Sequence, residues 1–320
     1  MTTATPTAPT AAPPTARTPW LRASGLTKDY GAFRLADVSI EAAPGRVRGF
    51  FGPNGSGKTT TLSILAGLVR PDSGTVRLDT AASGLPGREP MAVLLDSFGY
   101  NPFLSGRDHL RTVARRFGRD RDRVGEVLES VGLASAARRR IGAYSLGMRR
   151  RLGLAEVLLV DADVVLLDEP TNGLDPDGIA WFRRTVRRMA ADGRAVILSS
   201  HLLGEAEGLI DDATFLVDGR VAWSGSYNEL LGSFAGTFSL LTGPRAFELA
   251  EALAERGIDV HQSGPAELAV RAEDLGAVQE MAVVCGIDAA VAESVRPSLD
   301  LVYHLIRSGK LAEKEASSHE

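Results

Sequence analysis

The middle of the chain alternates between short apolar segments and longer segments with helical spacing. Residues 46–51 have a strand pattern, and continuous apolar runs fill 164–167 and 195–198, whereas 176–190 repeats apolar residues every three or four positions. A strand covered by helices on both faces contains few polar residues, and strands that alternate with helices form parallel sheets. The pattern predicts an α/β fold with a mainly parallel sheet.

The regions around this centre add further elements. Residues 20–23 and 35–41 predict two antiparallel edge strands joined by a turn around Tyr30, and 75–78 and 92–95 predict two more short strands. Residues 106–160 are arginine-rich and mostly helical in pattern, with breaks at Gly118, Gly132 and Gly142. This segment predicts a helical insert, about 100–160, between two halves of the sheet.

The pattern resets after about residue 236. It predicts strands at 237–241, 258–261, 268–271 and 287–291, and helices at 245–256, 274–285 and 299–306. Two βαβ-like units closed by a last helix predict a small accessory domain of the split-βαβ kind. We therefore expect a first domain at 20–235 and an accessory α/β domain at 236–309. A Thr/Ala/Pro-rich tail at 1–19, without the apolar core of a signal peptide, is predicted to be disordered, and 310–320 is predicted to be a solvated, charged tail.

Composition narrows the class of protein. A chain of 320 residues allows about two domains, and 44% hydrophobic and 24% charged residues are typical of a globular protein. The net charge of -4 provides no general basic field, which argues against a nucleic-acid partner. Cys285 is the single cysteine, so no internal disulfide can form. No apolar run reaches the roughly 18 residues that span a bilayer, so a role in a membrane process would need another membrane-spanning protein.

Residues 52–59, Gly-Pro-Asn-Gly-Ser-Gly-Lys-Thr, lie between the strand at 46–51 and a helical pattern at 60–68. This is the context of a P-loop, whose backbone N–H groups converge on phosphate at a helix N-terminus. Lys58 adds a charge for the outer phosphates, and the Thr59 hydroxyl is suited to Mg²⁺. The alternative is a glycine-rich turn without a ligand. The predicted ATP-binding residues here are Gly52, Pro53, Asn54, Gly55, Ser56, Gly57, Lys58, Thr59 and Thr60.

Further motifs follow this loop in order. They are Tyr-Ser-Leu-Gly-Met at 144–148, Leu-Leu-Asp-Glu at 166–169, Asn-Gly-Leu-Asp at 172–175 and His201. Over residues 20–230 the chain resembles the nucleotide-binding subunits of ABC transporters. The resemblance implies a P-loop NTPase of the ABC type with ATP as substrate.

Two acidic residues follow the apolar run at 164–167. A carboxylate at the mouth of a buried strand can bind the Mg²⁺ that bridges two phosphates, and a neighbouring one can polarise water. These roles predict Asp168 as metal ligand and Glu169 as general base, although both could merely cap the strand. The resemblance implies that His201 is a switch histidine that hydrogen-bonds the γ-phosphate and orients water.

The motif at 144–148 is similar to the family signature Leu-Ser-Gly-Gly-Gln, from which it differs at three of five positions. In the family this motif reaches across a dimer to nucleotide bound by the other subunit. The residues expected to act in trans are Ser145, Leu146, Gly147 and Met148. The arginines at 149–151 are predicted to be a solvated helix face. The resemblance places Asp175 at the dimer seam, and it could also cap the helix that begins at Pro176.

Two positions near the phosphate loop are less regular. Tyr30 stands where the family has an adenine-stacking aromatic residue, although a turn or core tyrosine is the alternative. Asp96 stands where the family usually has Gln, and we predict a third acid at the metal, near the γ-phosphate. The following segment, 98–109, is a candidate docking surface through Tyr100, Phe103 and Leu104, the alternative being packing beneath the helical insert.

The resemblance implies a partner arrangement as well as a reaction. Two copies, expected to form a homodimer, would hold ATP and Mg²⁺ between them and act on separate membrane permease subunits from the cytoplasmic, inner face of the membrane. Ser-Leu-Gly-Met at 145–148 and Pro-Ser-Leu-Asp-Leu-Val-Tyr at 297–303 favour the branch that exports drugs, antibiotics or lipids. The alternatives are an importer subunit, a soluble ABC ATPase and a nucleotide-gated scaffold. The accessory domain could regulate, dimerise or shield a sheet edge.

Overall fold

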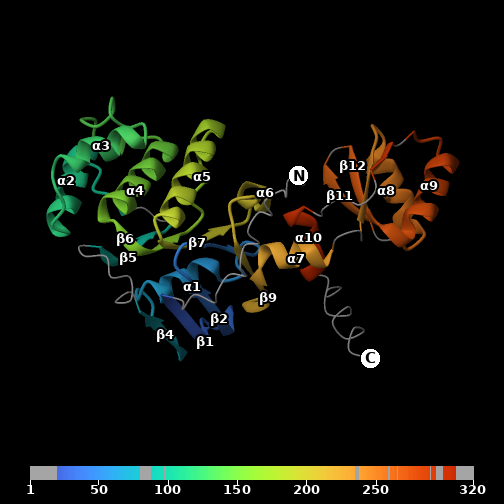
Figure 1. Ribbon diagram of the computed structural model, residues 1–320, viewed down its shortest axis with the longest axis horizontal. Coiled ribbons are helices and arrows are strands. Elements are labelled where there is room, and N and C mark those ends of the chain that lie inside the picture. Colours follow the sequence, from blue (N-terminus) through green and yellow to red (C-terminus); the bar gives the residue numbers. More distant parts are fainter. Residues whose placement is uncertain are drawn as a thin grey trace, which may run out of the picture.

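The computed structural model describes residues 20–307, except 80–87, 97–98, 235–237, 259, 265, 289 and 293–297. The two predicted tails, 1–19 and 310–320, lie outside these residues, as does Pro297 of the 297–303 motif. Figure 1 shows the helical insert and the C-terminal domain at opposite ends of the molecule.

The central sheet has six strands in the order β5-β6-β7-β3-β8-β9. All neighbours pair in parallel except β8 and β9, which are antiparallel. This confirms the predicted α/β class with a mainly parallel sheet. The strands are β3 (Val47–Phe51), β5 (Glu89–Leu94), β6 (Ala162–Leu167), β7 (Ala195–Ser200), β8 (Asp212–Val217) and β9 (Arg220–Ser226).

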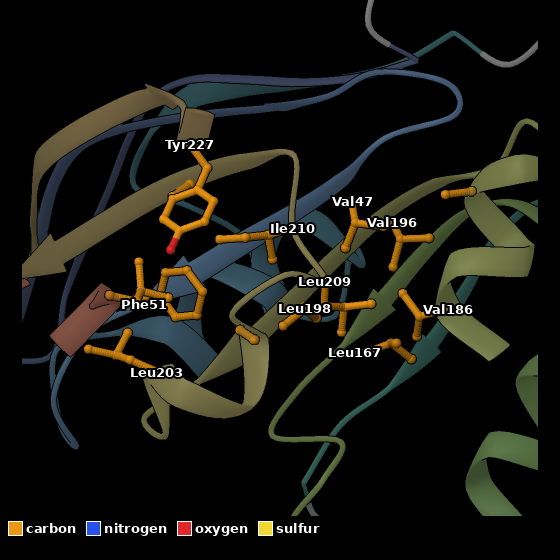
Figure 2. Packing of buried hydrophobic residues seen from close by; sticks show 14 of the residues in the cluster. Val47, Phe51, Leu167, Val186, Val196, Leu198, Leu203, Leu209, Ile210 and Tyr227 are labelled. Carbon is orange, nitrogen blue, oxygen red and sulfur yellow. The ribbon is translucent and has the colours of Figure 1, made fainter. Parts of the chain in front are cut away.

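The central strands are apolar because both of their faces are covered. Along β6, Val164 and Leu166 face one cluster of buried side chains, whereas Val165 and Leu167 face another. Helix α5 (Pro176–Ala191) covers the second face, and Figure 2 shows its Val186 beside Leu167. Alternating residues of one run therefore belong to two cores, as expected for a strand with helices or a second sheet on both sides.

The first face is covered by α1 (Lys58–Leu65) and by a separate antiparallel sheet. In that sheet β1 (Leu21–Asp29) pairs with β2 (Arg34–Ala42) on one side and β4 (Ser73–Leu78) on the other. The strands were predicted correctly, but their placement at edges of the main sheet was wrong. β1 and β2 pair within their own sheet. The antiparallel strand at the edge of the main sheet is instead β9, which pairs with β8.

The helical insert contains α2 (Gly106–Arg116), α3 (Arg123–Ser130), a short 3-10 turn (Ile141–Ala143) and α4 (Leu146–Val160). These helices share a core of their own, which includes Leu110, Leu128 and Leu152. The insert was predicted correctly. Four elements after His201 were not predicted, namely α6 (Leu203–Ala206), β8, β9 and α7 (Tyr227–Ser233). The two helices are too short to show a helical period, whereas β8 is as long as β6 and its apolar run was overlooked.

The C-terminal domain has the order β11-β12-β10-β13, with every pair antiparallel. This arrangement confirms the predicted split-βαβ architecture. Two helices cover its sheet and share a core with it. Its elements are β10 (Phe238–Thr242), α8 (Ala246–Glu255), β11 (Val260–Gly264), β12 (Glu267–Arg271), a 3-10 turn (Ala272–Asp274), α9 (Leu275–Val284) and β13 (Ala290–Ala292).

The last helix, α10 (Leu299–Arg307), does not close the C-terminal domain as predicted. Leu299, Val302 and Leu305 join the buried cluster of the first domain, together with Phe238 from the C-terminal domain. The Tyr303 ring stacks on Phe215 of β8 at 5.8 Å between centroids. The apolar spacing of α10 predicted a helix, but it did not show which core the helix would pack against. The helix contacts residues of both domains.

Candidate active site

The phosphate loop leaves β3 and curls over the start of α1. Gly57 precedes the helix with φ 104°, and a Cβ there would lie 2.7 Å from the Phe33 ring. At Gly52 a Cβ would lie 2.4 Å from the carbonyl oxygen of Leu216. Glycine is therefore required at both positions, by conformation and close packing at the first and by close packing at the second.

Lys58 is buried beneath this loop. Its Nζ donates to the carbonyl oxygens of Gly52, at 2.9 Å, and Pro53, at 3.3 Å, and lies 3.4 Å from Oε1 of Glu169. Only 6% of the residue is exposed. A buried ammonium group needs acceptors, and phosphate oxygens at the loop would be stronger acceptors than these carbonyls.

Asp168 is fully buried where α1, β6 and β7 meet. Its two carboxylate oxygens accept hydrogen bonds from Thr59 Oγ1, at 2.7 Å, and Ser199 Oγ, at 2.6 Å. A hydroxyl and a carboxylate are hard oxygen ligands, which suit Mg²⁺, and that ion takes its other ligands from phosphate and water. No group of three or more His, Cys, Asp or Glu side chains that could hold a metal occurs in the described part of the chain. The donor set therefore fits a metal bound together with a phosphate substrate.

Glu169 lies between Lys58 and His201. Its Oε2 is 2.8 Å from Nδ1 of His201 and accepts the His201 backbone N–H at 3.3 Å. The Ser199 hydroxyl accepts the backbone N–H of Glu169 at 3.0 Å. Glu169 also has φ 46°, in the left-handed region, which costs a non-glycine residue about 1 kcal/mol. A carboxylate held in this way by two neighbouring strands can accept a proton from water.

A cavity of about 490 Å³ lies beside these groups and is lined by Lys58, Thr59, Glu169 and His201 among others. The predicted residues Asp96, Glu169 and His201 thus lie beside the phosphate loop. Gly52, Pro53, Ser56 and Asp168 are not in the lining. Ser56 packs inside the loop, and the buried Asp168 accepts the Thr59 hydroxyl. The lining residues are Phe33, Asn54, Gly55, Gly57, Lys58, Thr59, Thr60, Asp96, Glu169, Asn172 and His201.

Tyr30 is not among these lining residues, and 54% of it is exposed. Phe33, three positions further on, forms part of the wall instead, against Gly57. Sequence reasoning missed Phe33 and Ser199, and it named Asn172 only within the motif at 172–175 and not at this cavity. The signal for Phe33 was its place in the same turn as Tyr30, and the signal for Ser199 was its position directly after the apolar run at 195–198.

The residues predicted to act in trans lie at a second cavity, of about 430 Å³, which shares no lining residue with the first. Ser145 caps α4, because its hydroxyl accepts the backbone N–H of Met148 at 3.2 Å. A Cβ on Gly147 would lie 2.5 Å from the carbonyl oxygen of Gly173, so the two motifs touch here. The lining includes Ser145, Gly147, Met148, Arg151, Gly173 and Asp175, whereas Leu146 is exposed.

Asp175 caps α5, as predicted for the residue before Pro176. Its carboxylate accepts the backbone N–H of Gly178 at 3.0 Å and pairs with Arg151 at 2.7 Å. The Gly178 hydrogen bond, together with Arg151, lowers the pKa of Asp175. The carboxylate stays charged at the edge of the second cavity, which leaves a role at a dimer seam open to it.

Arg150 contradicts the prediction of a solvated face at 149–151, because only 1% of it is exposed. One of its Nη atoms pairs with the carboxylate of Asp96, and the other donates to the backbone carbonyl of Asp168 at 3.3 Å. Helix α4 packs on the end of β6, which takes this position out of solvent. Because the Asp96 carboxylate is engaged by a guanidinium group, the arrangement does not support its predicted role as a third metal ligand.

The segment after Asp96 divides between the two interpretations considered above. Tyr100 and Leu104 pack on the core of the insert, as the alternative predicted. Phe103 is 77% exposed and stays a candidate for partner contact. Phe98 lies outside the described residues. Within the described residues, no helix combines the length and apolar character needed to cross a bilayer.

Comparison with known proteins agrees with this geometry. Residues 35–172 match the family model described as ABC transporter. A daunorubicin resistance ATP-binding protein of Streptomyces coeruleorubidus is 34% identical over 92% of this chain and 97% of its own length. A Nod factor export ATP-binding protein of Paraburkholderia xenovorans is 36% identical over 72% of this chain and 78% of its own.

Among solved structures, an ATP-binding subunit of an ABC transporter aligns with a TM-score of 0.60 and 26% identity. The alignment covers 67% of this chain and 93% of that one. The chain therefore belongs to the ATP-binding subunits of ABC transporters, whose reaction is ATP hydrolysis coupled to transport.

Proposed function

We propose that the chain is the ATPase subunit of an exporter, works as a homodimer that closes around two ATP molecules, and drives a separate membrane permease from the cytoplasmic face. The observation that carries the dimer is the division of the site into two cavities on one chain without shared lining. A subunit that holds the phosphates at Lys58 but presents Ser145 elsewhere needs a second copy to complete each site.

The first cavity supplies the groups for hydrolysis. Backbone N–H groups of the loop and Lys58 bind the phosphates, and Thr59 and Asp168 would hold Mg²⁺. The metal, when bound, offsets phosphate charge. Glu169 accepts a proton from water while the water oxygen bonds to the γ-phosphorus and the bond to ADP breaks, giving ADP and phosphate. His201 holds the Glu169 carboxylate in place.

Export is supported by the relatives described above, one named for drug resistance and one for Nod factor export. A drug, an antibiotic or a lipid is accordingly the cargo class that we propose. Cargo recognition would belong to the permease, because the two cavities described above serve nucleotide chemistry.

Complementation between two inactive variants tests the dimer. Lys58→Ala removes the phosphate cation, and Ser145→Asp places a carboxylate in the signature while keeping a good helix cap. Each variant alone should be inactive. A mixture should recover about a quarter of the wild-type rate, because half of randomly paired dimers are mixed and each holds one complete site.

The matched control pairs Lys58→Ala with the double variant Lys58→Ala/Ser145→Asp, which leaves no complete site in any pairing. Phosphate release by full-length protein with its permease in vesicles is the measurement. A mixture as inactive as this control, or a monomer that hydrolyses ATP at the full rate, would rule out the shared site.

A further inference from the structure

The Arg150–Asp96 pair connects the helical insert to the catalytic edge of the sheet. Arg150 lies on α4, whose capping residue is Ser145, and contacts both the Asp96 carboxylate and the Asp168 carbonyl. The side chain of Asp96 is 58% exposed and lines the phosphate cavity, whereas that of Arg150 is almost completely buried. One ion pair therefore spans the insert, the cavity wall and the residue that would hold the metal.

Each partner is costly without the other. A guanidinium group withdrawn from water loses its hydration and needs an anion nearby. An uncompensated Asp96 would add a negative charge to a cavity that already contains Glu169 and must accept phosphates. Together they form a neutral unit that contacts the backbone at Asp168.

The described chain beyond residues 97–98 is fixed to α4 at a second place. Nε2 of His109 lies 2.8 Å from Oε1 of Glu156 on α4, and the Tyr100 ring packs edge-on against His109 at 5.1 Å. Burial and the nearby Glu156 raise the pKa of Tyr100, so this phenol stays protonated. Asp96 is itself held by Arg150 on α4, and His109 is held by Glu156 on the same helix, so the positions of both depend on where α4 lies.

We infer that Arg150 is a positioning residue for ATP hydrolysis. It cancels the charge of Asp96 next to the terminal phosphate and couples the position of the signature helix to the Asp168–Glu169 backbone. The inference rests on the proposed ATP site. At the position where the family usually has a neutral Gln, this chain has Asp96 paired with Arg150. Through Arg150, helix α4 contacts the backbone of Asp168 directly.

Charge removal tests this inference. Arg150→Gln leaves Asp96 uncompensated, so affinity for MgATP should fall about tenfold while affinity for MgADP falls less than about threefold, since ADP lacks the γ-phosphate. The double variant Asp96→Gln/Arg150→Gln restores neutrality with two amides. It should recover the ATP affinity to within about threefold of wild type, while turnover recovers less, because the guanidinium contact to the Asp168 carbonyl is absent.

Arg149→Gln is the matched control, because it removes the same charge one position away on the same helix. It should leave the ratio of ATP to ADP affinity unchanged. The measurements are binding of fluorescent ATP and ADP analogues, turnover, and thermal unfolding of every full-length variant.

Equal losses for ATP and ADP in Arg150→Gln, or a double variant no better than Arg150→Gln, would show that Arg150 only supports the fold and would overturn the inference. The binding ratio decides this even if wild-type protein binds ATP without hydrolysing it. ATP binding without hydrolysis by the wild-type protein would instead contradict the proposed ATPase function.

Discussion

Strand β6 has two acidic residues near its start, Asp161 and Asp163, and two directly after its end, Asp168 and Glu169. The side chains that pair with the first two differ in kind from those that contact the last two. At the start, Asp161 pairs with Arg194 at 2.5 Å and has Arg88 and Arg123 within 4 Å, at 3.9 and 3.8 Å. Asp163 pairs with Arg88 at 3.5 Å. Arginine does not lose its proton in proteins, so the start of β6 is a permanently compensated network.

At the other end of β6, Asp168 accepts hydrogen bonds from two hydroxyl groups, and Glu169 lies between an ammonium and an imidazole. Hydroxyl groups leave the charge of Asp168 available to a metal. At Glu169 the imidazole can hold the carboxylate without permanently neutralising it, and the Lys58 ammonium, 3.4 Å away, would turn to phosphate oxygens when nucleotide binds. The type of partner thus separates acids that hold the domain together from acids available for chemistry, although both pairs adjoin the same apolar strand.

The largest expected effect is at the end of β6. Glu169→Gln keeps the shape of the side chain but removes the proton acceptor, so hydrolysis should fall about a thousandfold while ATP still binds. Phosphate release and nucleotide binding measure the two results. Asp161→Asn, the same change of charge at the start of β6, is the control and should hydrolyse ATP normally. Retention of more than a tenth of the rate by Glu169→Gln would remove Glu169 as the base.

The next effect is on stability, at the start of β6. Asp161→Asn leaves three arginines with one carboxylate fewer and should lower the free energy of unfolding by about 2 kcal/mol. Urea unfolding measures it. Asp192→Asn removes a more exposed partner of Arg194, 3.3 Å away, and should cost less than about 0.5 kcal/mol. If the two substitutions lower the free energy of unfolding equally, the network at Asp161 contributes no more to stability than the exposed Asp192–Arg194 pair.

The pH dependence of this stability sharpens the comparison further. Burial alone would raise the pKa of Asp161, but the hydrogen bond to Arg194 and the three arginine charges outweigh it and lower that pKa. A depressed carboxyl pKa stabilises the fold above the unfolded value, about 3.9, and this contribution is lost as pH falls through the folded value. The stability difference between wild type and Asp161→Asn should be constant from pH 7 to 5 and shrink below about pH 4. Unfolding at each pH measures it, and a constant difference at pH 3 would contradict the role assigned to the charge.

How much of this was predictable depends on whether a feature is local. The phosphate loop and the pair Asp168–Glu169 are contiguous motifs, so their positions were read from the chain, and parallel strands then bring Glu169 and His201 to one edge. The Arg150–Asp96 pair joins residues 54 positions apart, and which face of α4 is buried depends on tertiary packing. Similarly, the spacing of α10 predicts a helix, but the core that receives it is set by the whole fold.

The smallest expected effect concerns the nucleotide base, and it depends on which aromatic residue near the catalytic end of β6 stacks on adenine. Phe33 lines the phosphate cavity, whereas Tyr30 is exposed outside it. An aromatic contact contributes about 1 kcal/mol, so loss of the ring that stacks on adenine should weaken ATP binding about fivefold. We expect that loss for Phe33→Ala and a smaller one for Tyr30→Ala, measured by titration of a fluorescent ATP analogue. Inorganic triphosphate distinguishes base stacking from loss of loop support, because it has no base to stack. Damage to the loop beneath Phe33 would weaken it as much as ATP, whereas loss of stacking alone would leave its binding unchanged. A larger loss for Tyr30→Ala would mean that Tyr30 moves onto the base when nucleotide binds. The adenine-stacking role predicted for Tyr30 would then be correct, although Phe33 lines the cavity.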